Sequence, residues 1–254
     1  YLTQNYFSLI FMMNYYKAIM ATKKKSHQKE YKSEDKHVLD ILLKNVHFKA
    51  KTENQKKYYD LIGDKEITIC SGPAGVGKSM VSIIKALELL KDPNNSFKQI
   101  MVVKPIVEAH DNLGFLKGTL AEKLEPHLYS SVYLFEKIIG EENVKTLIEQ
   151  NFLKLTTMAF FRGINIDNAI LIAEEMQNAT PGQCKTLLTR IGYNSKFIIS
   201  GDLEQSDRYK TTKETGLYDV LNKCDDIPEI GIFYFDEKDI VRNKLISKIL
   251  KKYK

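Results

Sequence analysis

The sequence predicts an α/β fold in which a parallel sheet is covered by helices on both faces. Four short runs rich in Ile or Val are typical of buried strands: residues 66–71, 99–104, 168–173 and 196–201. Stretches with helical periodicity, such as residues 79–92 and 182–192, lie between them. Strands that alternate with helices need crossover connections, which make the strands parallel and place helices on both faces.

The composition fits a chain that folds around a sizeable core. Of its 254 residues, 43% are hydrophobic and 28% are charged, which excludes a chain disordered by composition. We expect a basic, flexible segment over residues 1–49, with one short helix near residues 35–43, and a single domain over residues 50–254. Residues 1–19 are expected to lie upstream of the true start, since Met20 opens a lysine-rich stretch typical of a cytoplasmic protein.

Charge is concentrated at the two ends of the chain. Residues 1–51 hold ten Lys against four acids, and residues 240–254 hold six Lys or Arg and no acid. Basic ends are compatible both with nucleic-acid binding and with solvated tails that aid solubility. The apolar run near the start is interrupted by polar residues and is too short to span a membrane, so no membrane partner is expected.

The three cysteines are too few and too widely spaced to form a disulfide framework. Cys70, Cys184 and Cys224 show neither CxxC spacing nor a Cys/His zinc pattern. An odd, sparse set of cysteines is typical of a reducing compartment, so we expect a cytoplasmic location.

A phosphate-binding loop follows the first predicted strand. Its residues fit the pattern GxxxxGK[ST] and are Gly72, Pro73, Ala74, Gly75, Val76, Gly77, Lys78 and Ser79. The glycines allow a tight turn whose N–H groups point inward, and the following helix adds its positive end. Lys78 is expected to reach the β- and γ-phosphates of a nucleotide, and the Ser79 hydroxyl to bind Mg²⁺.

Polar groups follow two further strands. Glu174 and Glu175 end the strand 168–173, where we expect Glu174 to hold Mg²⁺ through water and Glu175 to activate the attacking water. Two acids at a helix start would also be favoured by the helix dipole alone. Gln205 follows the strand 196–201 and is expected to sense the γ-phosphate, although Gly-Asp is ordinary turn chemistry as well.

In this order, the motifs resemble those of the PhoH-like family, P-loop ATPases related to superfamily 1 helicases. The resemblance covers residues 50–254. It implies a RecA-like P-loop NTPase fold with a helical insertion between the second strand and the strand that precedes Glu174 and Glu175. Besides GPAGVGKS, it rests on these segments: TENQ (52–55), KP (104–105), LGFLKGTLAEKLEP (113–126), FRG (161–163), EEMQN (174–178), SGDLEQSD (200–207), TGLYDVL (215–221) and DIVRNKLISKIL (239–250).

The resemblance implies roles for residues at matching positions. Gln55 looks like the glutamine that reads the adenine edge, which would favour ATP as the nucleotide. Lys104, before Pro105, looks like a contact to a nucleic-acid backbone. Gln177 and Gln205 look like γ-phosphate sensors, and Arg242 looks like an arginine that stabilises transition-state charge.

One position departs from the family pattern. The family usually has Asp where this chain has Glu174, so the carboxylate is shifted by about one bond length. A misplacement of about 1 Å can cost on the order of 10²-fold in rate, and we therefore expect Glu174→Asp to retain or raise ATPase activity.

The remaining length limits the architecture that this chain can supply. After Gln205 only 49 residues follow, too few for a second helicase-type domain. Together with the resemblance, this shortage predicts a ring-like homo-oligomer, such as a hexamer. The insertion over residues 106–160 shows amphipathic helical patterns at 120–128 and 131–150, and it could serve as a lid, an oligomer surface or a nucleic-acid contact.

Three classes of function are considered. The first is an ATPase coupled to RNA or another single-stranded nucleic acid. The second is a small-molecule phosphotransferase, which the small number of arginines disfavours, since there are only four. The third is a nucleotide-controlled binding protein with little turnover, which the Glu174 departure keeps open.

Overall fold

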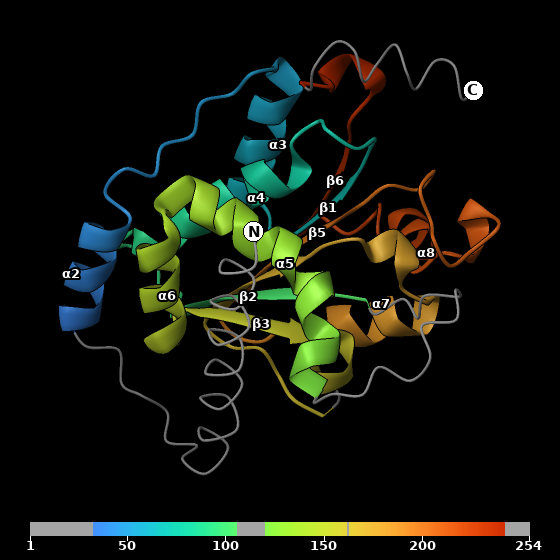
Figure 1. Ribbon diagram of the computed structural model, residues 1–254. Helices are drawn as coiled ribbons and strands as arrows, with labels where there is room; N and C mark the ends of the chain where they lie inside the picture. Colours follow the sequence, from blue (N-terminus) through green and yellow to red (C-terminus); the bar gives the residue numbers. More distant parts are fainter. Residues whose placement is uncertain (1–32, 106–119, 162, 242–254) are drawn as a thin grey trace, which may run out of the picture.

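The computed structural model describes residues 33–105, 120–161 and 163–241 (Figure 1). The expectations for residues 1–32, for residues 113–119 of the diagnostic block and for Arg242 fall outside these ranges. The described strands form one parallel sheet in the order β3-β2-β4-β5-β1-β6. The sheet and its helical layers confirm the predicted α/β class.

Four strands confirm the sequence-based expectations to within one residue at each end. They are β1 (Ile67–Ser71), β2 (Gln99–Lys104), β4 (Ala169–Ala173) and β5 (Lys196–Gly201). The strands β3 (Leu153–Thr157) and β6 (Ile230–Tyr234) were not predicted, and they form the two edges of the sheet. In the central part of the sheet, β5 pairs with β1, and Ile67 lies opposite Phe197.

Helices cover both faces of the sheet. One layer contains α2 (Ser33–Leu42), α3 (Glu53–Asp64), α4 (Lys78–Lys91), α5 (Leu120–Ile139) and α6 (Glu141–Glu149). The other contains α7 (Pro181–Leu188) and α8 (Gly216–Lys223). Short 3-10 turns complete the described elements: η1 (Met158–Phe161), η2 (Met176–Asn178), η3 (Thr212–Glu214) and η4 (Glu237–Asp239).

The helices of the insertion divide at a different place from the one expected. The sequence pattern suggested one helix ending near residue 128 and a second over 131–150, but α5 continues to Ile139 and the break falls at Gly140. Gly140 has φ +84°, a backbone conformation that glycine adopts without strain and other residues rarely adopt. A helix cannot continue through that conformation, so α6 starts a new direction.

Alternate residues of each central strand enter two separate cores. In β4, Ile170 and Ile172 pack into the core beneath α2–α6, whereas Ala169, Leu171 and Ala173 pack into the core beneath α7 and α8. This two-sided burial explains why the central strands are continuously apolar in the sequence. Among the helices of the described residues, none combines the length and apolar character that crossing a membrane requires.

Because all the strands are parallel, their carboxyl ends lie along one edge of the sheet. The loops after β1, β4 and β5 carry the phosphate loop, the acid pair and Gln205, respectively. In the sheet β5 lies between β4 and β1, so the Gln205 loop starts between the other two.

Candidate functional site

The phosphate loop connects β1 to the first turn of α4. Gly75 and Gly77 have φ values of +91° and +95°, conformations that favour glycine over residues with a Cβ. Lys78 donates hydrogen bonds from Nζ to the carbonyl oxygens of Gly72 (2.5 Å) and Pro73 (3.0 Å). The ammonium group is therefore held against the start of the loop, and Ser79 lies half-buried in the first turn of α4.

Two neighbouring segments hold this loop in place. The N–H of Gly72 donates to the carbonyl of Gly201 at the end of β5 (3.3 Å), and the N–H of Val241 donates to the carbonyl of Gly75 (3.2 Å). A Cβ on Gly72 would lie 2.6 Å from Cβ of Phe235, so only glycine allows this approach. The loop is thus fixed by the β5 end on one side and by residues 235–241 on the other.

Gln55 lies behind the loop and contacts its backbone. Its side chain is 5% exposed; Nε2 donates to the carbonyl of Val76 (2.8 Å), and Oε1 accepts from the N–H of Lys51 (2.9 Å). A Cβ on Gly77 would come within 2.8 Å of Gln55 Nε2. The Gln55 amide therefore supports the phosphate loop through its hydrogen bond to Val76.

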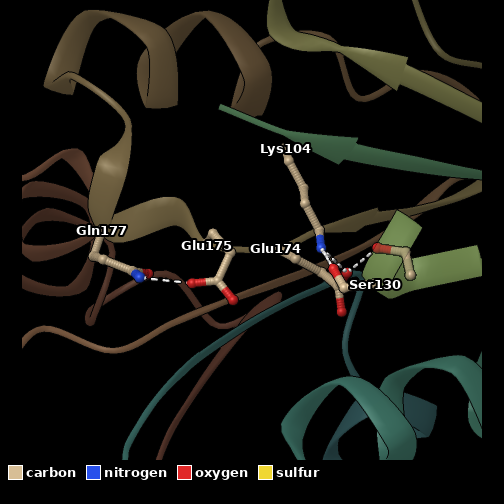
Figure 2. Close-up of polar contacts among 6 residues, drawn as sticks. Lys104, Ser130, Glu174, Glu175 and Gln177 are labelled. Carbon is tan, nitrogen blue, oxygen red and sulfur yellow. Dashed lines mark hydrogen bonds and ion pairs between the residues drawn. The ribbon is translucent and has the colours of Figure 1, made fainter. Parts of the chain in front are cut away.

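Glu174 is buried at the end of β4 and is paired with Lys104 at the end of β2 (Figure 2). Its Oε2 lies 3.3 Å from Lys104 Nζ and accepts a hydrogen bond from Ser131 Oγ (2.5 Å), while Lys104 Nζ also donates to Ser130 Oγ (2.6 Å). The Lys104 side chain is only 9% exposed. Lys104 therefore contacts Glu174 inside the protein. The resemblance implied instead that Lys104 contacts a nucleic-acid backbone.

The environment of the second carboxylate oxygen of Glu174 indicates whether the site fits a metal ion. Oε1 is buried and has no hydrogen-bond partner among the described residues. A buried carboxylate oxygen without a partner costs free energy unless a cation or water satisfies it, so the residue fits a water-mediated role toward Mg²⁺. No group of three His, Cys, Asp or Glu side chains within the described ranges could form a closed metal centre.

Glu175 differs from Glu174 in both conformation and exposure. Its backbone adopts φ 56° and ψ 35°, a left-handed conformation that is uncommon for a residue with a long side chain. The carboxylate is exposed, and its Oε2 accepts a hydrogen bond from Gln177 Nε2 (2.7 Å; Figure 2). Strained backbone of this kind is concentrated at functional sites, where the surrounding structure holds it.

The loop after β5 joins the acid pair to the phosphate loop. The carboxyl of Asp202 accepts from the N–H of Glu204 through Oδ1 (3.0 Å), and its buried Oδ2 has no partner among the described residues. Burial raises the pKa of this carboxyl, while the Glu204 N–H and the nearby charge of Lys78 oppose the shift. Asp202 therefore lies within the electrostatic reach of the phosphate loop.

Gln177 connects this loop to the acid pair, whereas the Gln205 side chain is exposed. Gln177 is 2% exposed and donates to the main-chain carbonyl of Gln205 (3.2 Å). Neighbouring Asn178 holds the same loop through Asp207, whose N–H donates to Asn178 Oδ1 (2.9 Å). Gln177 and Gln205 therefore contact each other through the main chain of Gln205 and not through its side chain.

Sequence reasoning missed the partners of these motif residues. Lys104 as the partner of Glu174, Ser131 as a donor to it, and Asp202 as an acid near Lys78 were not expected in those roles. One signal was available for Lys104, because a charged residue that ends a buried strand needs an opposite charge close by.

A family model and several curated relatives match this chain. The family model, described as PhoH-like protein, matches residues 47–254. A PhoH-like protein of Bacillus subtilis (strain 168) is 35% identical over 210 residues, which make up 83% of this chain and 65% of that protein. A PhoH-like protein of Synechocystis sp. is 34% identical over 229 residues (89% and 68%), and Protein PhoH of Escherichia coli (strain K12) is 32% identical over 206 residues (80% and 57%). The chain thus spans only part of the length of each relative.

Two solved structures share low similarity with it. The large terminase of a thermophilic bacteriophage aligns with a TM-score of 0.47 at 11% identity, covering 80% of this chain and 50% of the terminase. The Pyrococcus furiosus Hef helicase domain aligns with a TM-score of 0.45 at 12% identity, covering 73% of this chain and 38% of that one.

Proposed function

Because the chain belongs to the PhoH-like family, we propose that it hydrolyses ATP with Mg²⁺ and that single-stranded nucleic acid, RNA in particular, stimulates the reaction. Its fold is that of a RecA-like P-loop NTPase. The observation that carries the proposal is that the phosphate loop, the acid pair and the Gln205 loop follow three adjacent strands at one edge of the sheet.

In the proposed reaction, the phosphate loop binds the phosphates of ATP. Lys78 releases the carbonyl oxygens of Gly72 and Pro73 and binds β- and γ-phosphate oxygens instead. The negative phosphate oxygens attract its ammonium group more strongly than neutral carbonyl oxygens do. The exposed carboxylate of Glu175 orients the attacking water and accepts its proton. Gln205 contacts the γ-phosphate region, and Arg242, which follows Val241 in the chain, is proposed to stabilise the transition-state charge.

Ser79 and Glu174 are the residues proposed to hold Mg²⁺, Ser79 directly and Glu174 through water. When bound, Mg²⁺ neutralises developing charge on the phosphate oxygens. Lys104 already compensates one oxygen of Glu174, so the unpartnered Oε1 is the oxygen left for a metal-bound water.

The loop after β5 supports a link to nucleic acid. Its exposed basic side chains are Arg208, Lys210 and Lys213. Arg208 lies over the ring of Tyr209, 5.5 Å from its centroid. Acidic residues in the same stretch balance these charges, so contact with phosphates would depend on individual side chains. The loop leads from Gln205, and binding there would act on the ATP site directly.

The Lys104–Glu174 pair favours a second candidate function. A Glu174 whose charge is already compensated by a buried lysine could bind metal weakly and leave a nucleotide-controlled binding protein with little turnover. A cytoplasmic location is part of either proposal and is supported by the three free cysteines.

Steady-state ATP hydrolysis with Mg²⁺, with and without single-stranded RNA or DNA, tests the proposal. We expect turnover that rises with nucleic acid and is lost in Lys78→Ala. The variant Lys210→Ala/Lys213→Ala should keep basal turnover and lose stimulation. Tight ATP binding without turnover in the wild-type chain would support the nucleotide-controlled binding protein instead, and turnover that ignores nucleic acid would remove the coupling.

A further inference from the structure

Gln177 uses both of its amide donors on neighbouring protein groups. Nε2 donates to Glu175 Oε2 (2.7 Å) and to the carbonyl of Gln205 (3.2 Å), and Oε1 accepts from the N–H of Asp202 (3.0 Å). A glutamine amide has two N–H donors, so none remains for a ligand. The side chain is also only 2% exposed, which separates it from any group that binds at the surface of the loop.

The surroundings are shaped to hold this amide. A Cβ on Gly201 would lie 2.5 Å from Gln177 Oε1 and 2.7 Å from Leu217 Cδ2, so a larger residue there would displace the amide. Main-chain bonds fix the same turn, since the N–H of Asn178 donates to the carbonyl of Glu175 (3.0 Å). The position of the Gln177 amide is thus set by β5 as well as by its own turn.

Glu175 needs such support because its own backbone is strained. A left-handed conformation in a residue other than glycine costs free energy and persists only where neighbouring groups fix it. The carboxylate itself is exposed and would otherwise sample several rotamers. The hydrogen bond from Gln177 restricts it to one orientation.

We propose that Gln177 is a positioning residue for hydrolysis, which rests on the ATPase function proposed above. It orients the Glu175 carboxylate and joins it to the 202–205 loop, so that Glu175 and Gln205 keep a fixed relation. This assignment replaces the γ-phosphate contact that the resemblance implied for Gln177. The role belongs to the amide's donors, since a carboxylate of the same shape cannot donate to Glu175.

The variant Gln177→Glu tests the assignment at a pH where the new carboxyl is ionised, because it keeps the side-chain shape and a carboxylate has no donor. We expect kcat to fall at least tenfold, while the affinities for ADP and for a non-hydrolysable ATP analogue, measured by calorimetry, change less than threefold. In a Glu175→Ala background the same substitution should change kcat less than twofold. Gln150→Glu, at the exposed end of α6, is the matched control.

A thermal-unfolding cycle gives a second readout that needs no activity. Gln177→Glu should lower the unfolding temperature by about 2–4 °C in the wild-type background, and by clearly less when Glu175 is Ala. Equal shifts in both backgrounds would show that the two side chains do not interact and would overturn the proposal.

The remaining outcomes separate this proposal from the ATPase itself. A selective loss of affinity for the ATP analogue relative to ADP would make Gln177 a γ-phosphate contact, and full additivity with Glu175→Ala in kcat would place its action elsewhere. Either result overturns the positioning role alone. Absence of hydrolysis by the wild-type chain would overturn the ATPase proposal and this one together.

Discussion

Glu174 carries a carboxylate in the interior, where the free energy of desolvation has to be offset by its partners. Lys104 and Ser131 both contact Oε2, and Lys104 is buried as well. Removing one member of such a pair typically costs about 3–5 kcal/mol, because the remaining charge is left without compensation. The length of the glutamate side chain therefore matters for the protein interior as well as for metal binding.

The variant Glu174→Asp separates the contribution of Glu174 to stability from its contribution to metal binding. The shorter side chain withdraws the carboxylate from Lys104 and Ser131, so we expect the free energy of unfolding to fall by about 1–3 kcal/mol. Urea unfolding measures this loss, and Glu149→Asp at an exposed position of α6 is the control.

ATP hydrolysis by the same variant shows whether the length of Glu174 matters more for stability or for metal binding. The sequence pattern predicts that turnover is retained or raised, whereas the Lys104 contact predicts that it falls together with stability. Turnover that rises while stability is unchanged would show that the contact with Lys104 contributes little.

At the scale of the elements, the end of α3 is joined to the start of β5 by one lysine. Lys196 donates from Nζ to the carbonyl oxygens of Gly63 (3.1 Å) and Lys65, which close the last turn of the helix. The side chain is buried, and this burial, with a smaller effect from nearby Lys85, lowers its pKa to about 8. Asp64 and Glu66 oppose the shift.

This junction predicts a pH-dependent stability. Between pH 8 and 10.5, Lys196 has lost its proton in the folded protein but keeps it in the unfolded chain, so the unfolded state binds more protons. The stability of the wild-type protein relative to Lys196→Gln should therefore rise by of the order of 1 kcal/mol as the pH rises through this window. Below pH 8 the difference should be constant.

Denaturant unfolding at several pH values measures this difference. Lys56→Gln, at an exposed position of α3, reports the pH dependence that the whole chain shares. A difference between wild type and Lys196→Gln that stays flat from pH 7 to 10.5 would show that Lys196 titrates alike in both states.

At the scale of the whole molecule, the sequence predicted the centre of the sheet better than its edges. The central strands β4 and β5 are buried along their whole length and read as continuous apolar runs. The edge strand β3 alternates buried and half-buried residues, because Lys154 and Thr156 lie on the less covered face, and β6 contains Gly231 and is only partly buried. Short strands of this kind leave a weak signal.

The candidate site divides in the same way. The phosphate loop and the acid pair could be recognised, because their residue types and spacing follow from the chemistry of phosphate and metal binding. The direction of the Gln177 amide and the Lys104–Glu174 pair could not, since they depend on strands and helices that meet only after folding. A sequence motif shows which side chains a site contains, whereas their contact partners depend on the tertiary structure.

The assembly of several chains is a proposal at this scale. We propose a ring-like homo-oligomer, such as a hexamer, and expect light scattering to give a mass near six times 29.3 kDa in the presence of ATP and Mg²⁺. Lys78→Ala shows whether assembly depends on the nucleotide. A monomer mass with and without ATP would contradict the ring.

The position of β5 also governs the order in which this protein can be built during synthesis. Four of the other described strands precede it in the chain, yet the sheet is continuous only when β5 has entered between β1 and β4. A nascent chain that stops short of residue 196 holds β1 apart from the group β2, β3 and β4, and each has an open, apolar edge. In the native sheet, the phosphate loop and its acids are therefore brought together only once that strand has emerged from the ribosome and paired with β1 and β4.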